Sequence, residues 1–111
     1  MTEAEGCAVL LEEFSAAGLA IVERFPFDEG GVKVELDGWD EARRVGYEYV
    51  TEEARDRDEF TPRNVVALED RMRAGELWVL LVDEHDGETD GELRSVAKAF
   101  LGHLKGRGVV P

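Results

Sequence analysis

Residues 77–83, Leu-Trp-Val-Leu-Leu-Val-Asp, form the longest uninterrupted apolar run of the chain and end at a charged residue. A short apolar run of this kind is typical of a strand that is covered on both faces and central in its sheet. It is far shorter than the roughly 20 apolar residues that a membrane-spanning helix needs. We therefore expect a buried strand here, with helices packed against it.

Helical patterns lie on both sides of this strand. Residues 61–75 begin with Thr-Pro, which supplies an N-cap and a first-turn proline, and end in glycine. Residues 91–105 and 3–17 carry apolar side chains at helical spacing, and Gly18 is placed to end the second of these helices. The sequence thus predicts helices before and after the strand, and a third at the beginning of the chain.

The segment between residues 19 and 36 predicts a β-hairpin. Residues 19–25 are mostly apolar and are followed by Pro26, which we interpret as the end of a strand. Residues 32–36 alternate between apolar and charged side chains, as a half-buried strand does. The turn between them, residues 26–31, is then a loop of six residues, longer than the tightest hairpins have.

Residues 39–57 predict a long helix with two adjoining apolar stripes and an acidic stripe beside them. Within the acidic stripe, Glu48, Glu52 and Asp56 repeat every four residues. The expected element order is α-β-β-α-α-β-α over residues 1–111. The fold class is α+β: a single compact domain in which helices pack on a small three-stranded mixed sheet.

The charge of the chain narrows the classes of partner. Acidic residues outnumber basic ones 26 to 13, which gives a net charge of −13 and disfavours direct binding to nucleic acid or to an anionic membrane. The single cysteine, Cys7, rules out an internal disulfide and fits a cytoplasmic protein. Cys7 lies on an apolar helix stripe among acidic neighbours, so we expect a buried structural thiol. An alternative is that the acidity serves only solubility.

The first functional hypothesis is a small non-enzymatic module that docks a basic protein, as immunity proteins, antitoxins, inhibitors and chaperones do. Aromatic side chains bordered by carboxylates suit such a surface, because the rings supply contact area and the acids attract a cationic partner. The alternative is that the rings are core residues and the acidic stripe a solvated face. The residues predicted to contact the partner are Trp39, Tyr47, Glu48, Glu52 and Asp56.

Two further hypotheses belong to other classes. Residues 83–92 are rich in acids, and the spacing of Asp86, Glu88 and Asp90 resembles half of a calcium-binding loop, which favours weak binding of a divalent cation or small ligand. The alternative for this segment is a solvated turn before a helix. In the last hypothesis the hairpin edge, or the second stripe of the 39–57 helix, makes a homodimer or scaffold. No nucleophile, cofactor or phosphate-binding motif is found, so we expect neither catalysis nor a cofactor.

Overall fold

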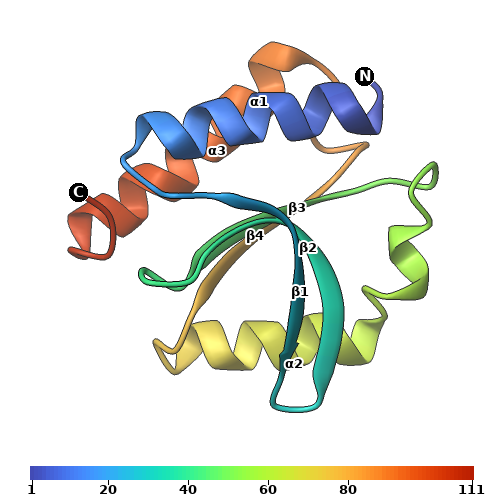
Figure 1. The fold of residues 1–111 in the computed structure, drawn as a ribbon. Coiled ribbons are helices and arrows are strands. Elements are labelled where there is room, and N and C mark those ends of the chain that lie inside the picture. Colours follow the sequence, from blue (N-terminus) through green and yellow to red (C-terminus); the bar gives the residue numbers. More distant parts are fainter.

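The computed structural model describes residues 1–111 and places three α-helices on the two faces of one four-stranded sheet (Figure 1). The sheet order is β1-β2-β3-β4; β1 and β2 pair antiparallel, β2 and β3 pair antiparallel, and β3 and β4 pair parallel. This confirms a single compact α+β domain. The elements in chain order are α1 (Glu3–Ala16), β1 (Val22–Glu29), β2 (Val32–Asp40), β3 (Val45–Val50), the short 3-10 helix η1 (Asp56–Asp58), α2 (Pro62–Arg73), β4 (Trp78–Asp83) and α3 (Asp90–Gly106).

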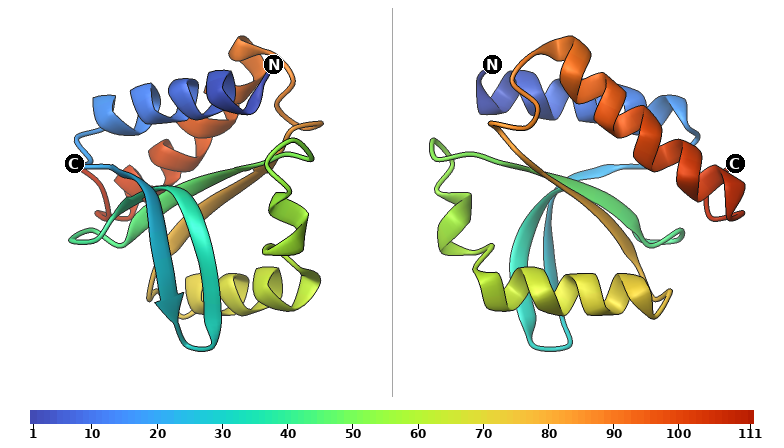
Figure 2. Two further views of the ribbon diagram at one scale, coloured as in Figure 1. Left: turned by 45° about the vertical axis from the view of Figure 1, so that its right-hand side comes forward. Right: turned by 180° about the vertical axis from the view of Figure 1, so that it is seen from behind.

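Two apolar cores lie on opposite sides of the sheet. Figure 2 shows α1 and α3 on one face of the sheet and α2 on the other. Helices α1 and α3 cover one face, where the ring of Phe14 lies 4.8 Å from that of Tyr47. Helix α2 covers the other face, where Phe27 meets Trp39 edge-on at 5.5 Å. Three of the four predicted helices therefore form, and each buries one apolar side against the sheet.

The hairpin is longer and its turn tighter than the sequence predicts. Strands β1 and β2 pair up to Glu29 and Val32, which leaves a two-residue turn at Gly30 and Gly31. Both glycines have positive φ, +57° and +81°, as a tight hairpin turn of the type I′ family requires. The expectation that Pro26 ends the strand is wrong, because β1 is an edge strand and its outer side needs no N–H donor.

The predicted helix over residues 39–57 is wrong. Trp39 lies near the end of β2, residues 41–44 form a turn, and Val45–Val50 is strand β3. Valine and tyrosine favour strands, and the pairing of β3 with both β2 and β4 outweighs the helical spacing of the acids. The sheet consequently has four strands instead of three.

Strand β4 lies within the apolar run of residues 77–83 and is at the edge of the sheet. It pairs only with β3 and follows it through the α2 crossover. Both of its faces are covered, as predicted, since Val82 belongs to the α1–α3 core and Val79 to the α2 core. The prediction that β4 is a central strand is wrong, because β4 has only one strand neighbour. That neighbour is β3, which lies in the segment predicted to be a helix.

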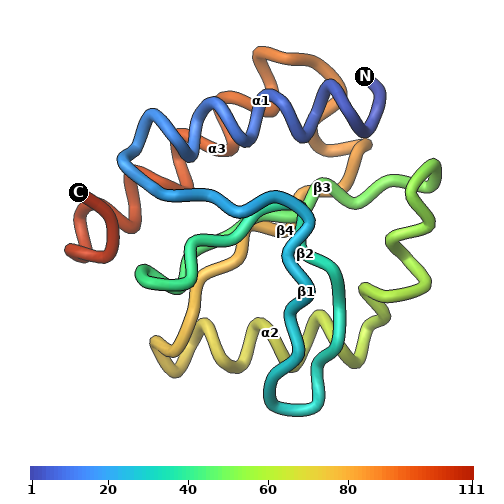
Figure 3. Tube along the Cα trace, viewed as in Figure 1, coloured from blue at the N-terminus to red at the C-terminus, as the bar shows by residue number.

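Strands β2 and β3 separate partway along their length. Their backbone pairing covers residues 38–40 and 45–47 only. Beyond it, the Asp37 carboxylate accepts the Tyr49 N–H at 2.8 Å, and the Glu48 carboxylate accepts the Asp37 N–H at 2.8 Å. Opposite Asp37, Arg24 has φ +52°, and the hairpin turns away across the sheet (Figure 3). Two side-chain carboxyl groups thus replace backbone ladder bonds where the strands diverge.

Replacing Gly46 by alanine tests the strand assignment. A Cβ there would lie 2.4 Å from the Gly38 carbonyl oxygen and 2.7 Å from the Trp39 ring. We expect Gly46→Ala to lower the free energy of unfolding by about 1–3 kcal/mol. Gly102→Ala, in open space on α3, is the control and should raise it by about 0.5–1 kcal/mol. A gain of stability in both variants, measured by urea unfolding, would indicate a helix at Gly46 and contradict the strand.

Candidate functional site

The structure does not bring the five predicted partner-binding residues onto one exposed face. Trp39, Tyr47 and Glu48 are fully buried within the sheet layers. Asp56 is nearly buried, and Glu52 alone is exposed. The predicted exposed helix flank therefore does not exist, and the two aromatic rings are core residues.

An acidic cavity of about 730 Å³ lies between α1, the β1–β2 hairpin and residues 54–59. Its rim is exposed and its floor is half-buried or buried. Two arginines, Arg24 and Arg55, line it together with seven acidic residues. These acidic residues are Glu3, Glu23, Glu35, Asp37, Asp56, Asp58 and Glu59.

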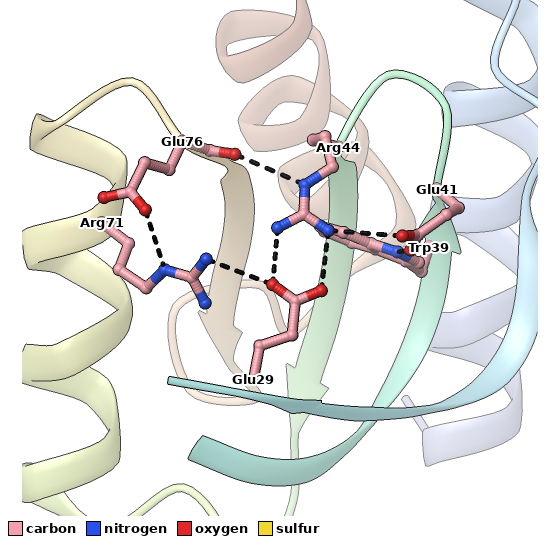
Figure 4. Close-up of polar contacts among 6 residues, drawn as sticks. All are labelled: Glu29, Trp39, Glu41, Arg44, Arg71 and Glu76. Carbon is pink, nitrogen blue, oxygen red and sulfur yellow. Dashed lines mark hydrogen bonds and ion pairs between the residues drawn. The ribbon is translucent and has the colours of Figure 1, made fainter. Parts of the chain in front are cut away.

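Elsewhere in the molecule, several carboxylates form ion pairs with the protein's own cations. Glu29 lies between Arg44 and Arg71, with oxygen–nitrogen distances of 2.6 and 3.1 Å (Figure 4). These hydrogen bonds, first that from Arg44, lower the pKa of Glu29 to about 2. The Arg44 guanidinium also lies 5.2 Å from the centre of the Trp39 ring. The network joins the hairpin end, the β2–β3 turn and α2.

A second set of ion pairs joins α1 to α3. Arg94 pairs with Glu13 at 2.9 Å, and Lys98 contacts the same carboxylate. In the cavity, by contrast, the only ion pair is the exposed one between Arg55 and Asp58, at 3.3 Å. Six of the seven cavity acids therefore form no ion pair, although exposed acids elsewhere, such as Glu52 and Glu69, also form none.

The floor of the cavity is a buried carboxyl cluster at the point where β2 and β3 separate. Burial, together with the neighbouring carboxylates of Glu3 and Asp56, raises the pKa of Asp37 to about 7. Burial and repulsion from Asp37 and Asp56 raise the pKa of Glu48 well above its usual range. The cluster consequently holds a proton at neutral pH.

The segment 51–59 closes one side of the cavity through its own hydrogen bonds. The Thr51 N–H donates to the Asp56 carboxylate at 3.0 Å, and Arg55 adopts φ +58° so that the chain can fold back. The Glu35 N–H donates to the Glu59 carboxylate at 3.0 Å, which fastens the segment to β2. Sequence reasoning missed the cavity because its walls come from segments far apart in the chain.

The acidic loop at residues 83–92 is not assembled around a common point. Asp86, Glu88 and Asp90 are exposed and do not form a group whose oxygens lie within reach of one ion. Asp90 instead pairs with Arg94 at 2.6 Å. The group of three ligand-type side chains that does converge is Glu3, Cys7 and Asp37, in the cavity.

Cys7 differs from the predicted buried thiol because it is only half-buried and lines the cavity. Burial and the carboxylates of Asp37 and Glu3 raise the pKa of its thiol strongly. In the structure the thiol donates a hydrogen bond to Glu3 at 3.7 Å. A thiol held neutral in this way is a poor nucleophile.

Comparisons of the chain with protein-family models, with curated proteins and with solved structures find no match. No helix of the fold combines the length and the apolar character that crossing a bilayer would require. The chemistry of the site consequently follows from the residues of the cavity themselves.

Replacing Glu48 by glutamine tests the buried cluster. A carboxyl whose pKa is raised in the folded state stabilises the fold fully only below its unfolded pKa of about 4.3, and this contribution is lost as pH rises toward the folded pKa. Glutamine mimics the protonated acid, so Glu48→Gln should raise the free energy of unfolding by about 1–3 kcal/mol at pH 8 and little at pH 4.

Denaturant unfolding at the two pH values measures this difference, and Glu52→Gln is the matched control at an exposed neighbour. A gain at pH 8 no larger than that of the control would show that Glu48 is not a buried, proton-holding group.

Proposed function

We propose that this chain is a small non-enzymatic binding module, acting in the cytoplasm, that docks a basic protein partner by accepting one of its lysine or arginine side chains into the acidic cavity. The observation that carries the proposal is the imbalance of charge there: seven acidic residues face two arginines, and one ion pair forms among them. The partner-binding role is thus moved from the predicted helix flank to the cavity.

The shape of the cavity favours a long cationic side chain. A volume of about 730 Å³ lies in the range of small-ligand sites and exceeds what one side chain needs, so adjoining backbone fits as well. Glu23, Glu35 and Glu59 are exposed at the rim, where they attract a cation from solution. Asp37 lies deeper and is partly shielded from water, which strengthens an ion pair made there.

The charge distribution also favours a partner over self-association. A net charge of −13 repels a second copy of the chain, whereas it accelerates association with a basic protein. Carboxylates that are already paired add little to this attraction. Glu29 is an example, because Arg44 and Arg71 neutralise its charge. The cavity acids are therefore the part of the surface best suited to a cationic partner.

Affinity capture with matched baits tests the proposal. The cavity bait carries Glu23→Gln and Glu59→Gln, which remove two rim charges while retaining an oxygen that accepts the Glu35 N–H. We expect the unmodified chain to capture a basic protein at low salt, and the cavity bait to bind that protein more weakly by up to about thirtyfold, since each of the two rim charges contributes up to about 1 kcal/mol.

The control bait carries Glu69→Gln and Asp86→Asn, two exposed acids outside the cavity, and has the same net charge as the cavity bait. Its affinity should remain within about twofold of the unmodified chain, because general attraction changes equally in both baits. Equal binding by the two variant baits, or no capture at low salt, would refute the proposed docking site.

A further inference from the structure

Three side chains with metal-ligand atoms converge on the floor of the cavity. Glu3 and Cys7 are one helical turn apart on α1, and Asp37 faces them from β2. One carboxylate oxygen from each acid and the Cys7 sulfur all lie within 4.8 Å of one another. Side chains at i and i+4 of a helix share a face, so α1 presents its two ligands together.

Glu48 provides a second and independent observation. Its side chain is fully buried, and its Oε1 atom accepts the Asp37 N–H at 2.8 Å. Its Oε2 atom has no hydrogen-bond partner, although burial leaves it no water. The charged groups nearest to it are the carboxyl groups of Asp37 and Asp56, so this oxygen faces the same cluster.

A buried oxygen without a donor, beside further carboxylates, is costly unless a positive charge compensates it. Within the cluster the protein supplies none, because neither Arg24 nor Arg55 forms an ion pair with Asp37 or Glu3. A bound cation would compensate the buried carboxylate oxygens that no cation of the chain neutralises.

We propose that Glu3, Cys7 and Asp37 bind one zinc ion. Glu48 acts as a positioning residue, because its carboxylate accepts the Asp37 N–H. A thiolate with two carboxylates favours a borderline-soft ion such as Zn²⁺ over calcium or magnesium, which prefer oxygen ligands alone. On binding, a zinc–sulfur bond forms and the Cys7 thiol proton passes to the solvent.

This inference goes beyond the proposed docking function and does not depend on it. The zinc site uses the floor of the cavity, whereas the docking test alters only Glu23 and Glu59 at the rim. Zinc binding is measured with the metal alone, so a failure of either proposal leaves the other standing.

Titration of the chelator-treated full chain with Zn²⁺, followed by calorimetry and thermal unfolding, tests the site. We expect one ion per chain and a rise in the unfolding temperature. Cys7→Ser and Asp37→Asn should each weaken zinc binding by at least about 100-fold. With Co²⁺ in place of zinc, a thiolate-to-metal absorption band should appear for the unmodified chain and vanish in Cys7→Ser.

Two substitutions at Glu48 separate a positioning role from a purely structural one. Glu48→Gln retains an oxygen that accepts the Asp37 N–H and should keep the zinc affinity within about threefold, whereas Glu48→Leu removes the acceptor and should weaken zinc binding by about 10–100-fold. Thermal unfolding of each metal-free variant shows that it is folded. Unchanged zinc affinity in Glu48→Leu, or an equal loss in both variants, would overturn the positioning role.

Asp86→Asn with Asp90→Asn is the control, since it neutralises the exposed acidic loop and leaves the cavity intact. This control should keep the zinc affinity of the unmodified chain. Absence of stoichiometric binding, or binding that survives Cys7→Ser but is lost in the control, would overturn the proposed site.

Discussion

The structure depends on two hydrogen bonds in which side-chain carboxylates take the place of backbone carbonyls between β2 and β3. Where the backbone ladder stops, the Asp37 carboxylate accepts the Tyr49 N–H and the Glu48 carboxylate accepts the Asp37 N–H. These two bonds keep the strands joined while the β1–β2 hairpin turns away to lie over α2. The cavity exists because the strands diverge there, and its acidity follows from the groups that bridge the gap.

The distribution of cations explains why one region remains strongly negative. The arginines that could neutralise acids are committed to joining elements: Arg44 and Arg71 hold the hairpin to α2, and Arg94 holds α3 to α1. Each pair contributes modestly to stability on its own, but each fixes the relative position of two segments. Six of the seven cavity acids form no ion pair, so their charge is not neutralised by the chain's own cations.

The sequence predicts the parts of this fold in which local pattern and tertiary packing agree. Helices α1, α2 and α3 have caps and apolar stripes, and strand β4 is a bounded apolar run, so their positions could be predicted within a few residues. The structure of residues 39–57 could not be predicted in this way. Their acids have the four-residue spacing of a helix, whereas their valines and tyrosines favour a strand. There the pairing of β3 with two neighbours decides the structure.

The candidate site was beyond sequence reasoning for a different reason. Cys7, Asp37 and Glu59 are distant in the chain, and only the separation of β2 from β3 brings them around one cavity. One local signal was present: Glu48 is an acid within Val45–Val50, a run otherwise made of glycine, valine and tyrosine. An acid in a segment with strand-forming neighbours on both sides indicates a buried carboxyl group and thus a place to look for function.

The position of β4 has a consequence for how the molecule comes apart. Strand β4 contributes Val82 to the α1–α3 core and Val79 to the α2 core. Leu77, the residue before the strand, also belongs to the α2 core. The only strand partner of β4 is β3, and the whole of α2 lies between the two strands in the chain. Detachment of β4 would expose both cores to water together. We therefore expect the two sides of the sheet to unfold as one cooperative unit.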